Sequence, residues 1–156
     1  MNTEQYLEKL RSGLPIKFSD FIELIDSEYH FSNIAFENGE IINSKFENQG
    51  SAKVFCFGHM HSLSELETLH CFAEHYQSVL HSPEDNSSHL NIRSFMKQGW
   101  EGLLLDFDAL KIKTNPRATS EYITPDIKPL ISTSTKKSGE SYIIMKGSNK
   151  NACIIC

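Results

Sequence analysis

A change in composition near residue 113 constrains the fold of this 156-residue chain more than any other feature. Residues 1–112 contain 8 basic and 17 acidic side chains, a net charge of −9, with large apolar residues throughout. Residues 113–156 contain 7 basic and 3 acidic side chains, a net charge of +4, and show no sustained apolar period. A segment of that kind buries too little apolar surface to fold alone. We therefore predict one folded domain at residues 1–112 and a flexible, disordered basic tail at residues 113–156.

The spacing of apolar residues in the first segment predicts a mainly α fold, a compact bundle of about five helices with minor extended or hairpin structure. The expected helices cover residues 3–10, 19–29, 51–60, 64–80 and 88–98. Ser51 is the expected cap of the third helix, Ser64 and Glu67 have the spacing of a capping box, and Gly99 ends the last helix. Residues 30–50 are rich in turn formers and predict a loop with a small hairpin, and residues 103–107 predict a short extended segment.

Composition also limits the classes of partner and compartment. An acidic domain disfavours nucleic acid, because binding a phosphate backbone requires Lys and Arg clustered on one face. The densest apolar runs, Val54–Phe57 and Leu103–Leu105, are far shorter than a membrane-spanning helix requires. The four cysteines are too few for a disulfide framework, so a reducing compartment is expected, with Cys56 and Cys71 as small buried apolar residues.

Several sequence blocks in the middle of the chain match the blocks of a known protein family in both order and spacing. The blocks are Ala35–Gly39, Asn48–Phe55, His61–Ser64, Phe72–Tyr76, His89–Met96 and Gly99-Trp100. Together they resemble the HopJ type III effector family over about residues 3–112. The family tends to have Glu and Cys where this chain has Gln49 and Ala52. The resemblance implies a protein made in the bacterial cytoplasm and translocated to a host cell, and it supplies no catalytic residues.

The histidines raise the question of a metal site, because six of the seven lie between residues 59 and 89. Zinc requires three or four convergent ligands, and two ligands on one helix lie four residues apart. His59 and His61 are two residues apart, and His70 and His75 are five residues apart, so neither pair has the spacing of two zinc ligands on one helix. We therefore predict neither a metal site nor a cofactor. Cys71, close to two of these histidines in the sequence, is the thiol with the better prospect of acting as a nucleophile.

A set of polar residues predicts a pocket for an anion or a peptide carboxylate. On the last helix, His89 and Arg93 are four residues apart and share a face. Turns and helix ends supply the others, so the predicted pocket residues are Asn48, Lys53, His61, His89, Asn91 and Arg93. The competing interpretation is structural: Asn48 stabilises a turn and Arg93 pairs with an acidic side chain. Both interpretations stay open, and no catalytic residue is predicted.

The sequence Cys153-Ile154-Ile155-Cys156 matches the prenylation pattern of Cys, two aliphatic residues and a final residue. Cys is an unusual final residue, and the pattern operates only inside a eukaryotic cell, because bacteria lack the transferases. The alternative is a redox or metal-binding Cys pair. One prenyl chain gives marginal membrane binding, and the basic tail is the expected second signal.

Together these observations predict a non-enzymatic interaction module in a host cell, with an unknown host protein and the host membrane as partners. The alternative is a cytoplasmic small-ligand binder or enzyme that uses the His/Asn/Arg pocket.

Overall fold

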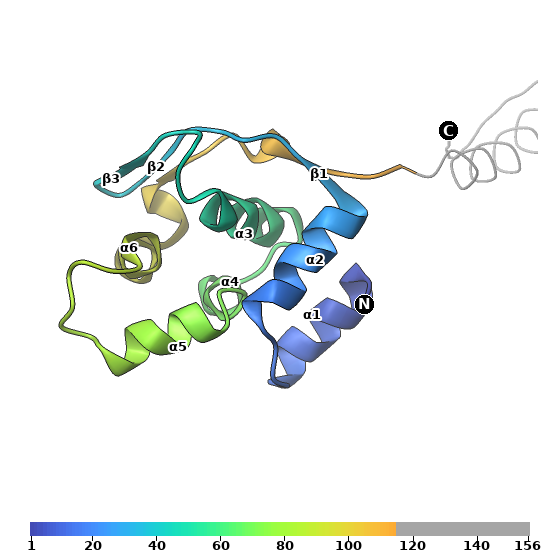
Figure 1. Ribbon diagram of the computed structural model, residues 1–156, viewed down its shortest axis with the longest axis horizontal. Coiled ribbons are helices and arrows are strands. Elements are labelled where there is room, and N and C mark those ends of the chain that lie inside the picture. The colour runs from blue at the N-terminus through green and yellow to red at the C-terminus, as the bar shows by residue number, and fades with distance from the viewer. Residues whose placement is uncertain (115–156) are drawn as a thin grey trace, which may run out of the picture. The chain divides into compact units, whose positions relative to one another are not determined.

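The structure is a computed structural model that describes residues 1–114, and it confirms a mainly α fold with minor strands (Figure 1). The α-helices of this part are α1 (Thr3–Ser12), α2 (Phe18–Glu28), α3 (Gln49–Met60), α4 (Glu65–His70), α5 (Glu74–His81) and α6 (Leu90–Gln98). The strands are β1 (Tyr29–Phe31), β2 (Phe36–Asn38), β3 (Ile41–Asn43), β4 (Leu103–Leu104) and β5 (Leu110–Ile112), with 3-10 turns at Gly99–Gly102 and Phe107–Ala109. The predicted tail lies outside the described residues, so its disorder stays a prediction.

Helix α3 forms the centre of the domain, as its apolar composition predicts. Ala52 and the run Val54–Gly58 are buried, so almost the whole circumference of this helix faces protein. Phe57 packs edge-on against Tyr6 of α1 and Phe21 of α2, with ring centroids 5.7 and 5.3 Å apart. On the other side, Phe55 lies 5.0 Å from Phe95 of α6. Aromatic contacts from three surrounding helices therefore hold α3 in place.

The strands form two small antiparallel sheets (Figure 1). One pairs β1 with β5, and the other has the order β3-β2-β4. The connection between β2 and β3 is a tight turn in which Gly39 has a φ of 62°, a conformation that favours glycine. This turn confirms the hairpin expected within residues 30–50.

The prediction of one helix over residues 64–80 was wrong in part, because α4 ends at His70 and α5 begins at Glu74. The capping box itself is present: Glu67 N donates to Ser64 Oγ at 3.1 Å, and Ser64 N donates to Glu67 Oε1 at 3.0 Å. The break places Ala73 at φ 54° and ψ −121° and buries Phe72 in the core. Sequence periodicity cannot show this break, because the apolar spacing continues across it.

Two helix starts also differ from the prediction. Helix α3 begins at Gln49 with Asn48 as its cap residue, so Ser51 lies inside the first turn and does not cap the helix. Helix α6 begins at Leu90 with His89 as its cap residue, and it ends at Gly99 as expected. Among residues 1–114, no helix is long and apolar enough to cross a membrane.

Candidate functional site

The most elaborate polar arrangement of the domain lies where α3 and α6 begin. A hollow of about 560 Å³ opens there. It is called the asparagine hollow below, and its walls are Phe18, Ile41, Ile42, Asn43, Glu47, Asn48, Gly50, Ser51, Phe72, His75, Ser87, His89, Leu90, Asn91 and Ile92. These residues come from α2, β3, α3, α5, α6 and the loops between them. The hollow therefore depends on how the whole domain packs.

Three buried asparagines form a network beside this hollow, and two of them, Asn43 and Asn91, line it. Asn38, Asn43 and Asn91 are all less than 5% exposed. Asn43 Oδ1 accepts hydrogen bonds from Asn91 Nδ2 at 2.9 Å and from Asn48 Nδ2 at 2.8 Å. Asn91 Oδ1 accepts from Asn38 Nδ2 at 3.1 Å and from Asn43 Nδ2 at 3.2 Å. Among residues 1–114, the buried amide atoms of this network all have partners except Asn38 Oδ1. Such bonds are strong in a low-dielectric interior, so the network fixes β2 and β3 against α6.

The cap residues of α3 and α6 both face the hollow in an unusual conformation. Asn48 and His89 have φ values of 53° and 51°, in the left-handed region, and neither side chain caps its helix. The first backbone N–H groups of an α-helix have no partner within the helix, and such groups favour anions. The His89 ring also lies 5.3 Å from the ring of His75. The hollow thus combines hydrogen-bond donors with apolar walls.

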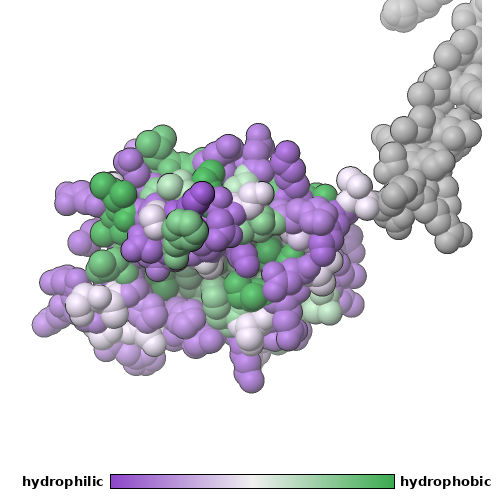
Figure 2. Space-filling view, turned by 45° about the horizontal axis from the view of Figure 1, so that its top comes forward, coloured by the Kyte–Doolittle hydropathy of each residue, from purple (hydrophilic) through white to green (hydrophobic). Residues whose placement is uncertain are grey.

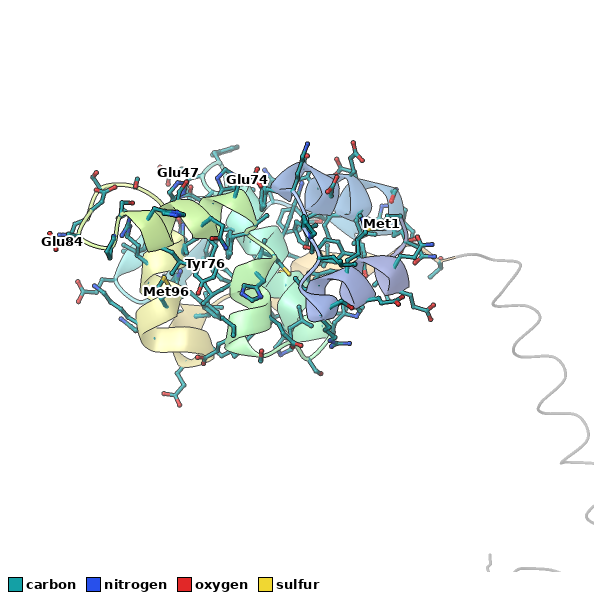
Figure 3. The ribbon with its side chains drawn as sticks, turned by 90° about the horizontal axis from the view of Figure 1, so that it is seen from below. Met1, Glu47, Glu74, Tyr76, Glu84 and Met96 are labelled. Atoms are coloured by element: carbon teal, nitrogen blue, oxygen red, sulfur yellow. The ribbon has the colours of Figure 1, made fainter. Side chains whose placement is uncertain are left out.

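A groove of about 530 Å³ lies on the side of Leu90 that faces away from the asparagine hollow. It is called the α5–α6 groove, and its walls are Glu40, Ile41, Val79, Leu80, Pro83, Asn86, Leu90, Arg93, Ser94, Met96, Lys97 and Gln98. Ile41 and Leu90 belong to both sets of walls, so the hollow and the groove adjoin. Figure 3 shows α5 and α6 with Met96 on α6 and Glu84 on the loop that joins the two helices.

The α5–α6 groove has exposed apolar residues at its edges. Leu80, Leu90 and Met96 are 39% to 46% exposed, which is costly for large apolar side chains in water. Figure 2 shows hydrophobic residues that reach the surface between hydrophilic ones. Both cavities have mixed polar and apolar walls, so together they are suited to a segment of another molecule that carries both kinds of group.

The structure distributes the six predicted pocket residues over several places. Asn48, His89 and Asn91 line the asparagine hollow together. Arg93 lines the adjoining α5–α6 groove and is held by Asp85, at 3.6 Å, and by the Ser88 carbonyl, at 2.7 Å.

The other two predicted residues line neither cavity. Lys53 Nζ lies 3.8 Å from Asp26 Oδ1 and 5.5 Å from the centre of the Phe31 ring. His61 Nε2 lies 2.8 Å from Tyr29 Oη at the opposite end of α3 from Asn48. Ligand binding by any of the six stays a prediction. Phe18, Phe72 and His75 also line the hollow. They are not among the predicted residues, because no local sequence signal indicates that they meet the start of α3.

Both cysteines of the described part are buried, as predicted for small apolar residues. Burial raises the pKa of the Cys56 and Cys71 thiols to about 12. A thiol with such a pKa stays protonated near neutral pH, which argues against Cys71 as a nucleophile. Among residues 1–114, no group of three or more His, Cys, Asp or Glu side chains is arranged to hold a metal ion.

The fold and this site define a class: a mainly α domain wrapped around one buried helix, with a buried asparagine network beside a surface hollow. Comparison with known proteins identifies the family. The model of the HopJ type III effector protein family matches residues 3–110, and the chain belongs to this family. The resemblance found in the sequence is thereby confirmed.

A solved structure is also similar to this chain. It is described as the crystal structure of the unknown function protein VPA0580, with 41% sequence identity and a TM-score of 0.68. The match covers 72% of this chain and 95% of that chain. Among curated proteins, none matches the chain.

Proposed function

We propose that this chain is an effector of the HopJ family that is translocated into a host cell and acts there as a non-enzymatic interaction module. The observation that carries the proposal is the pair of adjoining cavities on either side of Leu90. Their polar groups include buried amides that bond one another, and such amides do not titrate near neutral pH. This chemistry is suited to recognition, and family membership supports delivery to a host.

The partner in this proposal is a host protein segment with apolar side chains and one carboxylate. The apolar side chains would cover Leu80, Leu90 and Met96 in the α5–α6 groove. The carboxylate would lie in the asparagine hollow, where the N-termini of α3 and α6 and the two neighbouring imidazoles offer donors.

Delivery is tested with the full chain fused to a calmodulin-dependent adenylate cyclase, because this reporter produces cyclic AMP only inside a eukaryotic cell. We expect host-cell cyclic AMP when the bacterium has a working type III secretion system and a background level when the secretion ATPase is inactive. Equal signals from the two strains would contradict delivery by this route.

Binding is tested by proximity labelling in host cells with matched surface variants. We expect Leu90→Asp to remove the specifically labelled proteins, because it places a carboxylate between the two cavities. Leu66→Asp is the control: Leu66 is 55% exposed on α4 and lines neither cavity. Equal labelling by wild type and Leu90→Asp would refute the proposed surface, and the circular dichroism of both variants reports whether they fold.

A second candidate function is binding or conversion of a small ligand, favoured by the convergence of Asn48, His89 and Asn91 on one hollow. A ligand in the hollow shifts the backbone NMR signals of Gly50 and Ser51 at the start of α3. We expect His89→Gly to abolish these shifts while the fold is kept, because glycine readily adopts the left-handed conformation of residue 89. A ligand library that shifts none of these signals removes this candidate.

Membrane targeting by prenylation of Cys153 is the remaining part of the proposal, and it requires that Cys156 be the final residue. Residues 153–156 lie outside the described part, so the support is the sequence pattern and the net charge of +4 in residues 113–156. In eukaryotic cells we expect the wild-type chain to carry a prenyl mass and to sediment with membranes, and Cys153→Ser to remain cytosolic. An unmodified mass for the wild type would refute lipidation.

A further inference from the structure

A row of three exposed side chains crosses the outer face of the three-stranded sheet. In β2, Phe36 and Asn38 are buried, and Glu37 between them is exposed. Glu37 is paired with Ile42 of β3 on one side and with Leu104 of β4 on the other. Directly paired residues place their side chains on the same face of a sheet, so Ile42, Glu37 and Leu104 form one row. It is called the outer row below.

The outer row exposes more of its apolar side chains than the edges of the α5–α6 groove do. The β2–β3 hairpin lies at the margin of the domain (Figure 1), and its inner face bonds to α6 through Asn38 and Asn43. On the outer face, Ile42 is 77% exposed and Leu104 is 68% exposed. Large apolar side chains in water are unfavourable, and neighbouring ones mark surfaces that bind a partner.

The carboxylate at the centre of the outer row determines the charge of that partner. Glu37 belongs to none of the ion pairs formed within residues 1–114. A partner that covers Ile42 and Leu104 also removes water from Glu37, which is costly unless the partner supplies a cation. A second copy docked through the same row about a two-fold axis would place Glu37 against Glu37, and like charges repel. The net charge of −9 in residues 1–112 also attracts a basic partner.

The width of the outer row determines the shape of the partner. Ile42 and Leu104 lie two strand spacings apart, about 9.6 Å. On an α-helix, the residues three before and four after a central residue are about 10.5 Å apart along the axis. In an extended segment, the residues two before and two after a central residue are about 13 Å apart. The helix matches the row, and arginine suits its centre, because the guanidinium bonds a carboxylate twice and its stem is apolar.

We propose that the outer row is a docking site for an amphipathic helix of a partner protein. An arginine of that helix pairs with Glu37, and apolar residues about one turn to either side cover Ile42 and Leu104. Ile42 is also a wall residue of the asparagine hollow, so the outer row adjoins the surface proposed above. The docked helix requires neither the carboxylate partner nor the Leu90 surface of that proposal.

The docking site is tested by NMR titration of the full chain with two synthetic helical peptides. Both carry leucine three residues before and four residues after a central residue, which is arginine in one peptide and glutamate in the other. We expect the arginine peptide to shift the backbone signals of the outer row and to bind at least about tenfold more tightly than the glutamate peptide. Glu37→Arg should invert this preference. The matched control Glu23→Arg, at an exposed position of α2, changes the net charge equally and should keep it, as should Leu90→Asp.

Several outcomes would overturn the docking site. One is that neither peptide shifts the outer-row signals, and another is that Glu37→Arg still prefers the arginine peptide or that Glu23→Arg inverts the preference as well. Outer-row signals that shift with the concentration of the chain alone would show a second copy as the occupant and would also refute the proposal. If Glu37→Arg does not fold, Glu37→Gln provides the same test, because it removes the charge and keeps the size of the side chain. We expect Glu37→Gln to bind both peptides equally, and a wild-type preference in this variant would contradict the role of Glu37.

Discussion

Replacing Asn43 with alanine tests whether the buried asparagine network holds the candidate site together. Asn43 accepts hydrogen bonds from Asn48 and Asn91 and donates to Asn91 Oδ1, at 3.2 Å, and to the Phe36 carbonyl, at 3.4 Å. The alanine variant removes all four. Asn48 is exposed and can bond water instead, but Asn91 Nδ2 is buried and loses its acceptor.

The expected cost follows from the Asn91 donor that is left unpaired and from the hydrogen bonds that are lost. A buried donor left without an acceptor costs about 1 to 3 kcal/mol, and an ordinary hydrogen bond contributes about 1 kcal/mol net. We therefore expect Asn43→Ala to lower the free energy of unfolding by about 3 kcal/mol, a large share of the 5 to 15 kcal/mol typical of a domain. Asn91→Ala should cost less, about 1 to 2 kcal/mol, because Asn38 keeps the Asn91 carbonyl as an acceptor.

The assay is urea unfolding of the full chain, followed by far-UV circular dichroism. For a domain of this size the expected loss shifts the midpoint by on the order of 1 to 3 M urea. Asn33→Ala is the matched control, because Asn33 is exposed and donates a single bond, to the Lys45 carbonyl. The double variant of Asn43 and Asn91 should cost less than the sum of the singles. A loss below about 1 kcal/mol in Asn43→Ala, or one equal to the control, would refute this account of the network.

Three further predictions concern packing, thiol reactivity and backbone conformation. Gly58→Ala should lower the free energy of unfolding by about 1 to 2 kcal/mol, because the added Cβ would lie 2.7 Å from the buried Thr68 Oγ1. Urea unfolding measures this change, and an unchanged midpoint would show that α4 moves away from α3 at little cost. With both tail cysteines changed to serine, Cys56 and Cys71 should resist Ellman's reagent at pH 8 and react once urea is added, and fast labelling of the folded chain would contradict their burial. His89→Gly should keep the free energy of unfolding within about 0.5 kcal/mol of wild type, whereas His89→Val should lower it by at least about 1 kcal/mol, because a β-branched residue is strained at φ 51°. Equal free energies of unfolding for the two variants would show that residue 89 changes conformation.

The candidate site could be predicted from the sequence only in part. Asn48, His89 and Asn91 do share a hollow, whereas Arg93 lines the neighbouring groove. The buried partner Asn43 looked like an ordinary turn residue. Its bonds to Asn91 join positions 48 residues apart in the sequence, and no local pattern encodes such a pairing.

The sequence by itself determined the local structure: the mainly α fold, the capping box at Ser64, the hairpin at Gly39, the end of α6 at Gly99 and the HopJ family blocks. These features depend on residues within a few positions of one another, so they can be recognised in the sequence without knowledge of the fold. Only the tertiary structure decided the break at Cys71–Ala73, the asparagine network and the bonding of His61 to Tyr29. Each of these depends on which helices pack together, because burial and long-range hydrogen bonds override local preference.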